Sequence, residues 1–283
     1  MYKVGINFDE ISDDLETALQ VMKESDTTNG ELRTVNGKNF VFWDDTEVAA
    51  FKKNVADAGI ELIAAATPLF KWYVHQDDPE IKHDSFGFNP RLNDEEKRKV
   101  IERTFEIADS LSLPRLRIFS GLGEDNDAGT LFAQDPLLAF ALELADKYGI
   151  DLYLENEPVC RVYKKVHIID LFKNQKTPRL KLWLDIANLV EVDEVIDEAF
   201  LAQVADRLGY VHVKDFTMKD GQRSYVPVGE GQIDYPAILE AIDKLHIAGL
   251  IFTVETHAKT DKIGASVKSL EATKKLVYGL HNA

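Results

Sequence analysis

The sequence predicts a single-domain α/β fold, a (β/α)8 TIM barrel over residues 1–283. Short apolar, β-branched runs alternate with amphipathic stretches about eight times. No linker rich in Gly, Pro or Ser interrupts them, and 283 residues are close to the roughly 250 that such a barrel needs. An open, doubly wound sheet is the alternative, but the first expected strand leads into NFDEISDD and not into a glycine-rich dinucleotide-binding turn.

Eight apolar runs are the expected barrel strands, because each is short and rich in β-branched or aromatic residues. They are Lys3–Phe8, Glu31–Val35, Glu61–Thr67, Arg115–Ser120, Asp151–Glu157, Lys181–Leu189, Tyr210–Phe216 and Leu250–His257.

Helices are expected between these strands. After the first strand, Ile11, Leu15, Leu19 and Met22 form one apolar stripe. A second helix, Asn93–Leu111, begins with an Asn cap and three acids, which suit the positive end of a helix. The later expected helices are Pro136–Tyr148, Glu194–Leu208, Pro236–Leu245 and Ser266–Leu280. Two of them start at proline, which the first turn tolerates.

The segment Pro68–Leu92 is an unusually long connection that contains five aromatic residues. Loops of this length are uncommon inside a compact domain and often act as lids or binding loops. Its aromatic side chains could stack on a sugar and exclude water. The alternative is that they pack on the barrel rim or at a subunit interface, and the sequence leaves both open.

Composition points to a small-molecule partner. The chain has 49 acidic and 33 basic residues, a formal charge of −16, and no basic run that would attract nucleic acid or anionic membranes. No apolar stretch is long enough to span a membrane, and MYKVGINFDEISDD does not read as a targeting signal. Cys160 is the single cysteine, so we expect no internal disulfide and a reducing, cytoplasmic location. Assembly into a homo-oligomer is left open.

Four strands in the second half of the chain end in a side chain that can bind a metal. These are Glu155 in LYLENEP, Asp185 in LWLDIANL, His212 in YVHVKDF and Glu255 in FTVETH. In a (β/α)8 enzyme the active site lies at the carboxyl ends of the strands, where all four residues fall. A lone acid at a strand end is usually solvated or caps a helix, so the set of four carries the prediction.

Three carboxylates and one imidazole favour a hard divalent ion. Mn²⁺ is the expected ion, and Mg²⁺, Co²⁺ and Zn²⁺ are also compatible with these ligands. Such an ion can polarise a carbonyl and stabilise the enediolate that forms when a neighbouring C–H proton is removed. Because the three acids would leave the ion-bound group at a net charge of −1, a neutral hydroxy-carbonyl is expected to fit better than a phosphate.

Glu155 and Glu255 are the expected acid–base pair as well as metal ligands. They lie three strands apart in the ring, so they can reach one carbon from different sides and cause epimerisation, or isomerisation when the proton moves to the next carbon. The alternative for Glu255 is a purely structural ligand. Further substrate contacts are expected from six residues: Asn188, Lys214, Glu157, His257, and Lys71 and Trp72 of the long loop.

The segments LENEP, WLDIANL, VHVKDF, VGEGQIDY and VETH together resemble the xylose isomerase-like (β/α)8 superfamily. This superfamily includes sugar phosphate isomerases and epimerases, D-tagatose 3-epimerase, hydroxypyruvate isomerase, inosose dehydratase and endonuclease IV. The resemblance implies a metal-dependent enzyme of carbohydrate metabolism. In its sugar isomerases and epimerases, the ligand positions correspond here to Glu155, Asp185, His212 and Glu255, and the two glutamates exchange protons with substrate.

The sequence departs from the superfamily pattern in ways that bear on the substrate. Asn188 stands where a histidine often follows the strand-six aspartate, and Arg161 where the ketose epimerases carry a glutamate. Endonuclease IV needs an Asp-x-His pair where this chain has Arg223, Ser224 and Tyr225. The expected function is a sugar or hydroxy-keto acid isomerase or epimerase. The alternatives are a dehydratase of a keto-sugar or inosose, an endonuclease IV-like nuclease and a non-catalytic binding barrel.

Overall fold

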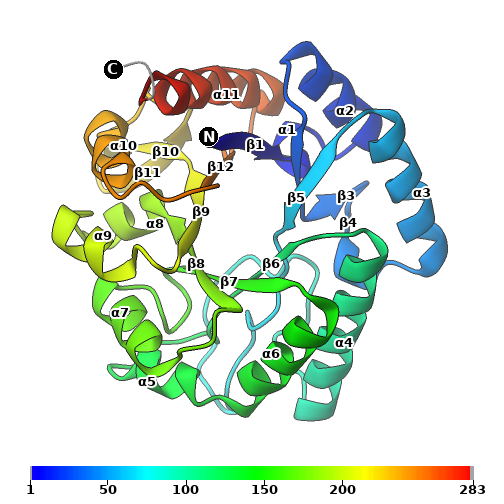
Figure 1. Cartoon of the computed structure of the whole chain (residues 1–283), viewed down its shortest axis with the longest axis vertical. Coiled ribbons are helices and arrows are strands. Elements are labelled where there is room, and N and C mark those ends of the chain that lie inside the picture. Colours follow the sequence, from blue (N-terminus) through cyan, green and yellow to red (C-terminus); the bar gives the residue numbers. More distant parts are fainter. Residues whose placement is uncertain (1, 281–283) are drawn as a thin grey trace.

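The computed structural model describes residues 2–280 and forms a closed barrel of eight parallel strands (Figure 1). The barrel strands are β1 (Lys3–Asn7), β2 (Asn29–Leu32), β5 (Glu61–Ala65), β6 (Arg115–Ile118), β7 (Asp151–Glu155), β8 (Leu180–Asp185), β9 (Leu208–Val213) and β12 (Ile251–Val254). Each strand pairs with the next barrel strand in sequence, and β1 closes the ring by pairing with both β2 and β12. The predicted fold class is confirmed.

Helices surround the barrel (Figure 1). They are α1 (Phe8–Ile11), α2 (Leu15–Glu24), α3 (Asp45–Asp57), α4 (Asp94–Ser110), α5 (Ala128–Ala133), α6 (Pro136–Tyr148), α7 (Lys165–Asn174), α8 (Ile186–Glu191), α9 (Glu198–Val204), α10 (Tyr235–Asp243) and α11 (Lys262–Gly279). The predictions for α4 and α6 are confirmed within a residue at each end. The single helix expected after Phe8 is wrong, because Ser12 ends α1 and the Asp14 side chain caps a new helix.

Several expected strands are too long at their carboxyl ends. The strand expected over Lys181–Leu189 stops at Asp185, because the Asp185 carboxylate caps α8 by accepting from the Asn188 amide at 2.8 Å. The strand expected over Tyr210–Phe216 ends at Val213, the last residue of β9. The chain then enters a hairpin of β10 (Asp215–Lys219) and β11 (Gln222–Val226). A shorter hairpin of β3 (Thr34–Val35) and β4 (Lys38–Asn39), followed by the 3₁₀ turn η1 (Phe40–Phe42), lies after β2.

A layer of large side chains fills the barrel interior beneath the ends of the strands. It includes Tyr153, Trp183 and Tyr210, which are all nearly or fully buried. The Trp183 and Tyr210 rings stack with centroids 3.6 Å apart, and the Trp183 ring lies edge-on to the His212 ring at 4.9 Å. This packed layer therefore forms a rigid floor under the polar residues at the top.

The long connection after β5 packs mostly onto the barrel. Four of its five aromatic residues, Phe70, Trp72, Tyr73 and Phe88, are at most 5% exposed. These four side chains therefore pack against the protein and do not form an open lid. The fifth, Phe86, is only partly buried and reaches a cavity at the top of the barrel. The loop thus contributes one aromatic side chain to the cavity.

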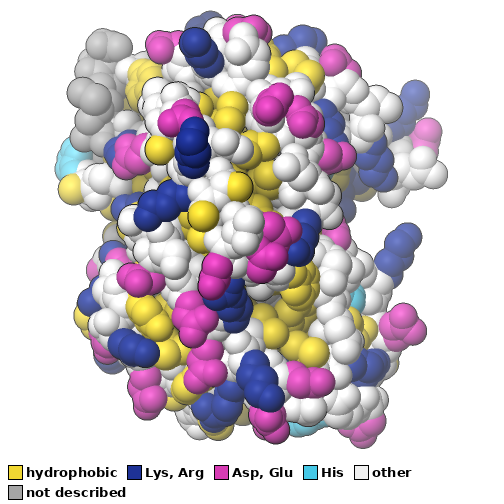
Figure 2. All heavy atoms as spheres, turned by 90° about the vertical axis from the view of Figure 1, so that its right-hand side faces the viewer, with side chains coloured by type: hydrophobic (Ala, Val, Ile, Leu, Met, Phe, Trp, Pro, Cys, Tyr) yellow, Lys and Arg dark blue, Asp and Glu magenta, His cyan; other side chains and the backbone are white. Residues whose placement is uncertain are grey.

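Charges of both signs are interspersed on the face of the molecule shown in Figure 2. Acidic and basic side chains alternate there with small apolar areas, and neither sign forms a continuous stripe on that face. Within residues 2–280, none of the helices combines the length and the apolar character that crossing a membrane requires.

Candidate metal centre

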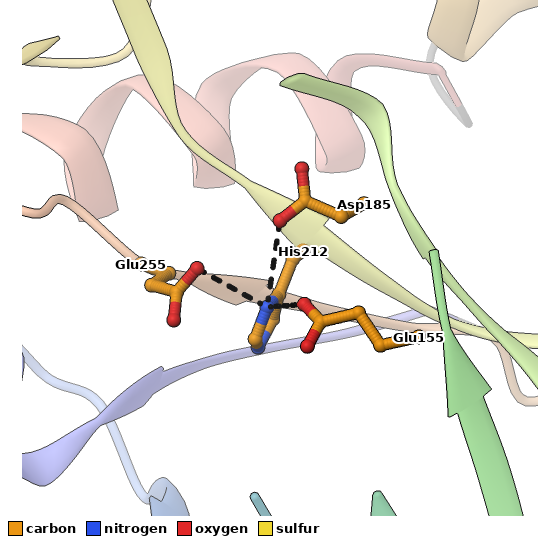
Figure 3. A group of neighbouring side chains, drawn as sticks. All are labelled: Glu155, Asp185, His212 and Glu255. Atoms are coloured by element: carbon orange, nitrogen blue, oxygen red, sulfur yellow. Dashed lines mark hydrogen bonds and ion pairs between the residues drawn. The ribbon is translucent and has the colours of Figure 1, made fainter. Parts of the chain in front are cut away.

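The four expected metal ligands meet at the carboxyl end of the barrel (Figure 3). The His212 Nδ1 atom lies 2.9 Å from Glu155 Oε1, 3.5 Å from Glu255 Oε2 and 3.8 Å from Asp185 Oδ2. One donor atom from each residue lies within 4.8 Å of the other three, and all four residues are buried. The structure thus brings together side chains that are far apart in sequence.

The spacing of these donor atoms fits a divalent ion. Ligands about 2.1 Å from an ion lie about 3.0 Å apart in neighbouring octahedral positions, and somewhat farther apart in tetrahedral ones. The observed separations of 2.9–3.8 Å from Nδ1 are of this size. The residues present therefore suit a divalent ion held through His212 Nδ1 and three carboxylate oxygens.

Glu31, in β2, orients the candidate histidine ligand. Its carboxylate lies 3.0 and 3.1 Å from His212 Nε2, on the side of the ring opposite the ligand cluster. The Tyr210 and Thr253 hydroxyls both donate to Glu31 at 2.8 Å, and the Asn7 amide donates at 3.0 Å. A carboxylate on the second nitrogen of a ligating histidine fixes its tautomer and raises its basicity. Nδ1 is therefore the nitrogen that faces the ligand cluster, where it lies 2.9 Å from Glu155 Oε1.

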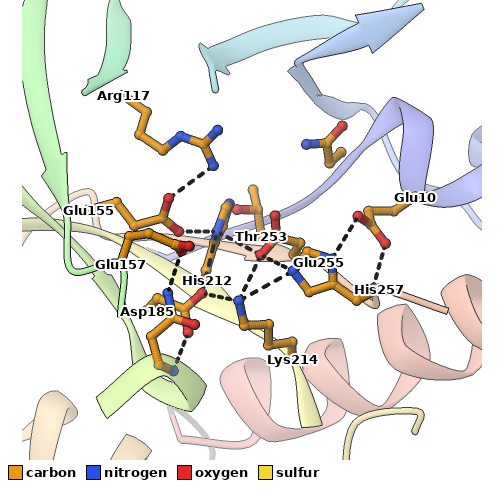
Figure 4. Close-up of polar contacts among 12 residues, drawn as sticks. Glu10, Arg117, Glu155, Glu157, Asp185, His212, Lys214, Thr253, Glu255 and His257 are labelled. Carbon is orange, nitrogen blue, oxygen red and sulfur yellow. Dashed lines mark hydrogen bonds and ion pairs between the residues drawn. The ribbon is translucent and has the colours of Figure 1, made fainter. Parts of the chain in front are cut away.

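Three buried cations pair with the carboxylates of the cluster, and Figure 4 shows two of them, Arg117 and Lys214. Arg117 lies 3.0 Å from Glu155, and Lys214 lies 2.8 Å from Asp185 and 3.1 Å from Glu255. Arg33 contacts Glu255 at 2.6 Å, but it also pairs with the acidic residues of α1. If Arg117, Lys214 and the Glu31 carboxylate beside His212 are counted with the four ligands, a divalent ion leaves the group neutral and not at the −1 expected from the ligands alone. The surroundings of the ligands are therefore less negative than the ligand set by itself implies.

The surroundings shift the pKa values of the three carboxylic acids in different directions. Burial alone would raise the pKa of Glu155, but Arg117 and His212 lower it to about 2. Burial likewise opposes ionisation of Glu255, yet Lys214, His257 and His212 hold its pKa well below the usual value. The pKa of Asp185 is raised by burial and by the two nearby glutamates. Both glutamates are thus kept as carboxylates.

The same acids also act on the imidazole of His212. Burial would lower the pKa of His212, but Glu31, Glu255 and Glu155 together raise it well above the usual value. An ion at Nδ1 must therefore compete with a proton, as is usual for metal ligands.

The HxKD and GEGxID motifs build the loop beside Lys214. The Asp215 carboxylate accepts hydrogen bonds from the amides of Gly229, Gly231 and Ile233 at 3.0–3.3 Å. A Cβ at Gly231 would collide with the Asp215 side chain, so only glycine fits there. The Tyr235 hydroxyl donates to the Lys214 carbonyl at 2.5 Å. Both motifs therefore fix the backbone that carries Lys214.

A cavity of about 180 Å³, called here the inner cavity, opens beside the cluster. Five of the six expected substrate contacts line it: Lys71, Glu157, Asn188, Lys214 and His257. The Lys71 ammonium lies 3.2 Å from the Glu157 carboxylate, and the side-chain amide of Asn188 donates to the same carboxylate at 3.3 Å. The Nε2 atom of His257 lies 3.2 Å from Glu255. The structure therefore brings these five residues to one space.

Trp72 does not reach the inner cavity, in contrast to the expectation. Its side chain is 2% exposed, packs against Phe70 and Phe88, and lines a separate hollow near α4 and α5. Phe86 of the same loop is at the cavity instead, together with Tyr225 of β11. The sequence could not choose between the two because both lie in one irregular segment with no periodicity.

An outer cavity of about 920 Å³ adjoins the inner one, and Asp84, Phe86, Tyr225 and His257 line both. A second group of possible ligands, Glu10, Glu255 and His257, lies at this boundary. The Glu10 oxygens, however, already accept from Arg33 at 2.6 Å, Thr256 at 2.8 Å and the His257 amide at 2.7 Å. This group is therefore satisfied by the protein itself.

Sequence reasoning missed Glu31, Arg33 and Arg117. A signal for these residues was present in the sequence. In ELRTV and RLRIF, charged residues alternate with apolar ones, although strands of a closed barrel have no solvent-facing side. Charged residues in such strands are expected to be paired or functional.

Solved structures with this architecture cover nearly the whole chain. An IolI protein with a bound zinc atom is 17% identical with a TM-score of 0.75, over 98% of this chain and 99% of that chain. An L-ribulose 3-epimerase is 15% identical with a TM-score of 0.73, over 100% and 96%. The probable 3-DHS dehydratase AsbF of petrobactin synthesis from Bacillus anthracis is 14% identical with a TM-score of 0.72, over 96% and 98%.

At these identities the solved structures establish the fold alone. A comparison with curated proteins finds no match. The family model described as xylose isomerase-like TIM barrel matches residues 29–276, so the chain belongs to that family.

Proposed function

We propose that this protein is a divalent-metal-dependent isomerase or epimerase of a sugar, a sugar derivative or a small hydroxy-keto acid. Glu155 and Glu255 would exchange protons with the carbon next to a carbonyl. The observation that carries this proposal is that two buried glutamates face one cavity while neighbouring cations keep both ionised. The epimerase among the similar structures agrees with it.

The proposed ion is Mn²⁺, with Mg²⁺, Co²⁺ and Zn²⁺ as the other fitting ions, held by Glu155, Asp185, His212 and Glu255. When bound, it would polarise the substrate carbonyl and stabilise negative charge on the oxygen. Glu31 holds the His212 ring in place. The carboxylate set is rich in oxygen donors, which supports a hard ion over a structural zinc.

The two glutamates approach from different strands. In the proposed reaction one removes the C–H proton and the other returns a proton from the other side, so the configuration at that carbon inverts. If the proton returns to the next carbon, the carbonyl moves instead. The Lys214 ammonium, which lies between Asp185 and Glu255, would stabilise the negative charge that develops meanwhile.

A dehydratase is the second candidate because a third carboxylate lines the same cavity. Glu157 is not a ligand candidate and is held by Lys71 and Asn188. As a carboxylate it could accept the C–H proton and then return it to the leaving hydroxyl, which departs as water. The dehydratase among the similar structures agrees with this alternative. No comparable observation favours a nuclease, since Arg223, Ser224 and Tyr225 replace the Asp-x-His pair that three-zinc chemistry needs.

Metal stoichiometry and hydrogen exchange test the proposal together. Elemental analysis after Mn²⁺ or Zn²⁺ reconstitution should find one ion per chain, and His212→Ala should lose it. In D₂O, the Mn²⁺ protein should exchange a C–H proton of a binding ketose or hydroxy-keto acid, and Glu155→Gln should abolish exchange. Glu61→Gln, an exposed glutamate of β5, is the matched control.

Each result has a defined meaning. Exchange at the wild-type rate in Glu155→Gln would remove Glu155 as the essential base. Three zinc ions per chain would support the nuclease, and no ion after reconstitution would support a barrel that binds without catalysing.

A further inference from the structure

Two cations are buried side by side at the inner cavity. Arg117 of β6 is 1% exposed and Lys71 of the long loop is 5% exposed, and both line the cavity. The same two rings contact both: Phe119 lies 4.6 Å from the Arg117 guanidinium and 4.8 Å from the Lys71 ammonium, and Phe86 lies 5.8 and 4.9 Å away. Aromatic faces stabilise cations but do not neutralise them.

Each of these two cations contacts a single carboxylate within residues 2–280. Arg117 has one carboxylate contact there, to Glu155, and that carboxylate is also a candidate metal ligand. Lys71 has one contact, to Glu157. The Arg117 Nε atom is buried without a hydrogen-bond partner among the described residues, and the guanidinium otherwise reaches the Thr67 carbonyl, at 3.4 Å. An incompletely paired buried guanidinium costs free energy unless a ligand completes it.

The other cations near this end of the barrel are differently placed. Arg223 lines the inner cavity but pairs with Glu191, and Arg161 lies in the separate hollow and pairs with Asp78. Lys214 is shared between two of the candidate metal ligands. Arg117 and Lys71 are therefore the pair best placed to take a ligand anion.

We propose that Arg117 and Lys71, enclosed by Phe86 and Phe119, form a carboxylate subsite, so that the substrate is a hydroxy-keto acid and not a neutral sugar. This inference rests on the proposed function, because it names the substrate of the same site. A planar carboxylate matches the fork of a guanidinium and takes the lysine as a second partner.

The size and charge of the cavity favour a carboxylate over a phosphate. Arg117 contacts Glu155 directly, so the anion lies within a few atoms of the carbon that Glu155 deprotonates. In a space of about 180 Å³, Glu157 lines the same wall and would repel a dianion more strongly than a monoanion. The substrate class is thereby narrowed to a compact acid whose carboxylate and carbonyl are close together.

The test is a binding measurement that does not depend on turnover. Calorimetry on the Co²⁺-loaded protein would compare cyclohexanecarboxylate with cyclohexanecarboxamide, which has the same shape without the charge. The carboxylate should bind at least roughly tenfold more tightly, since a charged hydrogen bond contributes about 1.5–3 kcal/mol. The visible spectrum of the Co²⁺ should stay unchanged, which shows that the probe is not on the ion.

Variants separate the subsite from general charge effects. Arg117→Gln and Lys71→Met should each remove most of the preference for the carboxylate, and Arg117→Lys should keep part of it. Lys71 pairs with Glu157 and not with a candidate metal ligand, so its variant serves if Arg117→Gln fails to fold. Lys3→Gln, at the opposite end of the barrel, removes the same charge and should change nothing.

Equal binding of acid and amide, no measurable binding of either, or a preference that survives both substitutions would overturn the proposal. A spectral change with retained affinity in Arg117→Gln would place the carboxylate on the ion and also overturn it. Equally strong competition by inorganic phosphate would assign a phosphate subsite instead. Metal content and D₂O exchange are separate readouts, so failure here leaves the proposed reaction standing.

Discussion

The Glu31 carboxylate and the His212 imidazole are 181 residues apart in sequence, yet Nε2 lies 3.0 Å from the nearer oxygen. Both groups are fully buried, and the Tyr210 and Thr253 hydroxyls hold the carboxylate in place. The histidine is therefore positioned from the far side of the barrel before any ion binds. Its Nδ1 atom consequently faces the three acids.

Replacing Glu31 with Gln should lower the affinity for Mn²⁺ by about 10–100-fold, because partners of this kind orient a ligating histidine and raise its basicity. Titration of the metal-free protein with Mn²⁺ measures this, and circular dichroism checks the fold. Glu61→Gln, on the neighbouring strand β5, is the control. Unchanged affinity in Glu31→Gln would mean that packing alone orients the ring.

Lys214→Met should slow hydrogen exchange by roughly 10²-fold, because an ammonium that stabilises developing charge is lost. The metal content should not fall, since removing a cation beside Asp185 and Glu255 makes the cluster more negative. Measuring both quantities on one preparation checks the pair of outcomes. A loss of metal with unchanged exchange per bound ion would instead assign Lys214 a purely structural role.

Asp9 should make stability depend on pH in mildly acidic solution. Arg33 serves three acids, and burial raises the pKa of Asp9 to about 6 against this pairing. Between about pH 4 and 6 the folded state keeps a proton that the unfolded state has released, so stability falls as the pH rises. The loss is at most about 3 kcal/mol, because each tenfold difference in proton affinity between the two states contributes about 1.4 kcal/mol.

The comparison for this prediction is Asp9→Asn, which mimics the protonated side chain. Urea unfolding from about pH 4 to 7 should show wild type losing stability relative to the variant across the interval. Asp13→Asn, an exposed acid nearby, should run parallel to wild type. Parallel curves for wild type and Asp9→Asn would contradict the prediction.

Trp183→Ala should destabilise the protein by about 3–5 kcal/mol, because it leaves a cavity in the packed floor of the barrel. The residue is fully buried and stacks on Tyr210. Since its ring also contacts His212, the variant should bind Mn²⁺ more weakly than Trp183→Phe does. Chemical unfolding and metal titration check the two effects. Met218→Ala, which is 50% exposed on β10, should cost less than about 0.5 kcal/mol.

The barrel and its four candidate ligands could be predicted from sequence alone. Strand runs recur with helical stretches between them, and the parallel connections bring every strand's carboxyl end to one rim, so Glu155, Asp185, His212 and Glu255 had to share it. Local signals also fixed α4 and α6, where a cap or a proline marks the start. The strand expected to continue to Leu189 ends at Asp185, which caps α8. Apolar residues lie on both sides of Asp185, so the sequence gives no clear sign of this end.

The surroundings of the ligands, by contrast, depend on contacts that form when the chain folds. Which residue of a long irregular loop reaches the cavity depends on packing, so Phe86 and not Trp72 is there. The contacts of Glu31 with His212, and of Arg117 with Glu155, join strands that are distant in sequence, and no local pattern records them. The charge beside a bound ion is a sum over such neighbours. For that reason the charge around the candidate ligands depends on the folded arrangement and not on the order of residues.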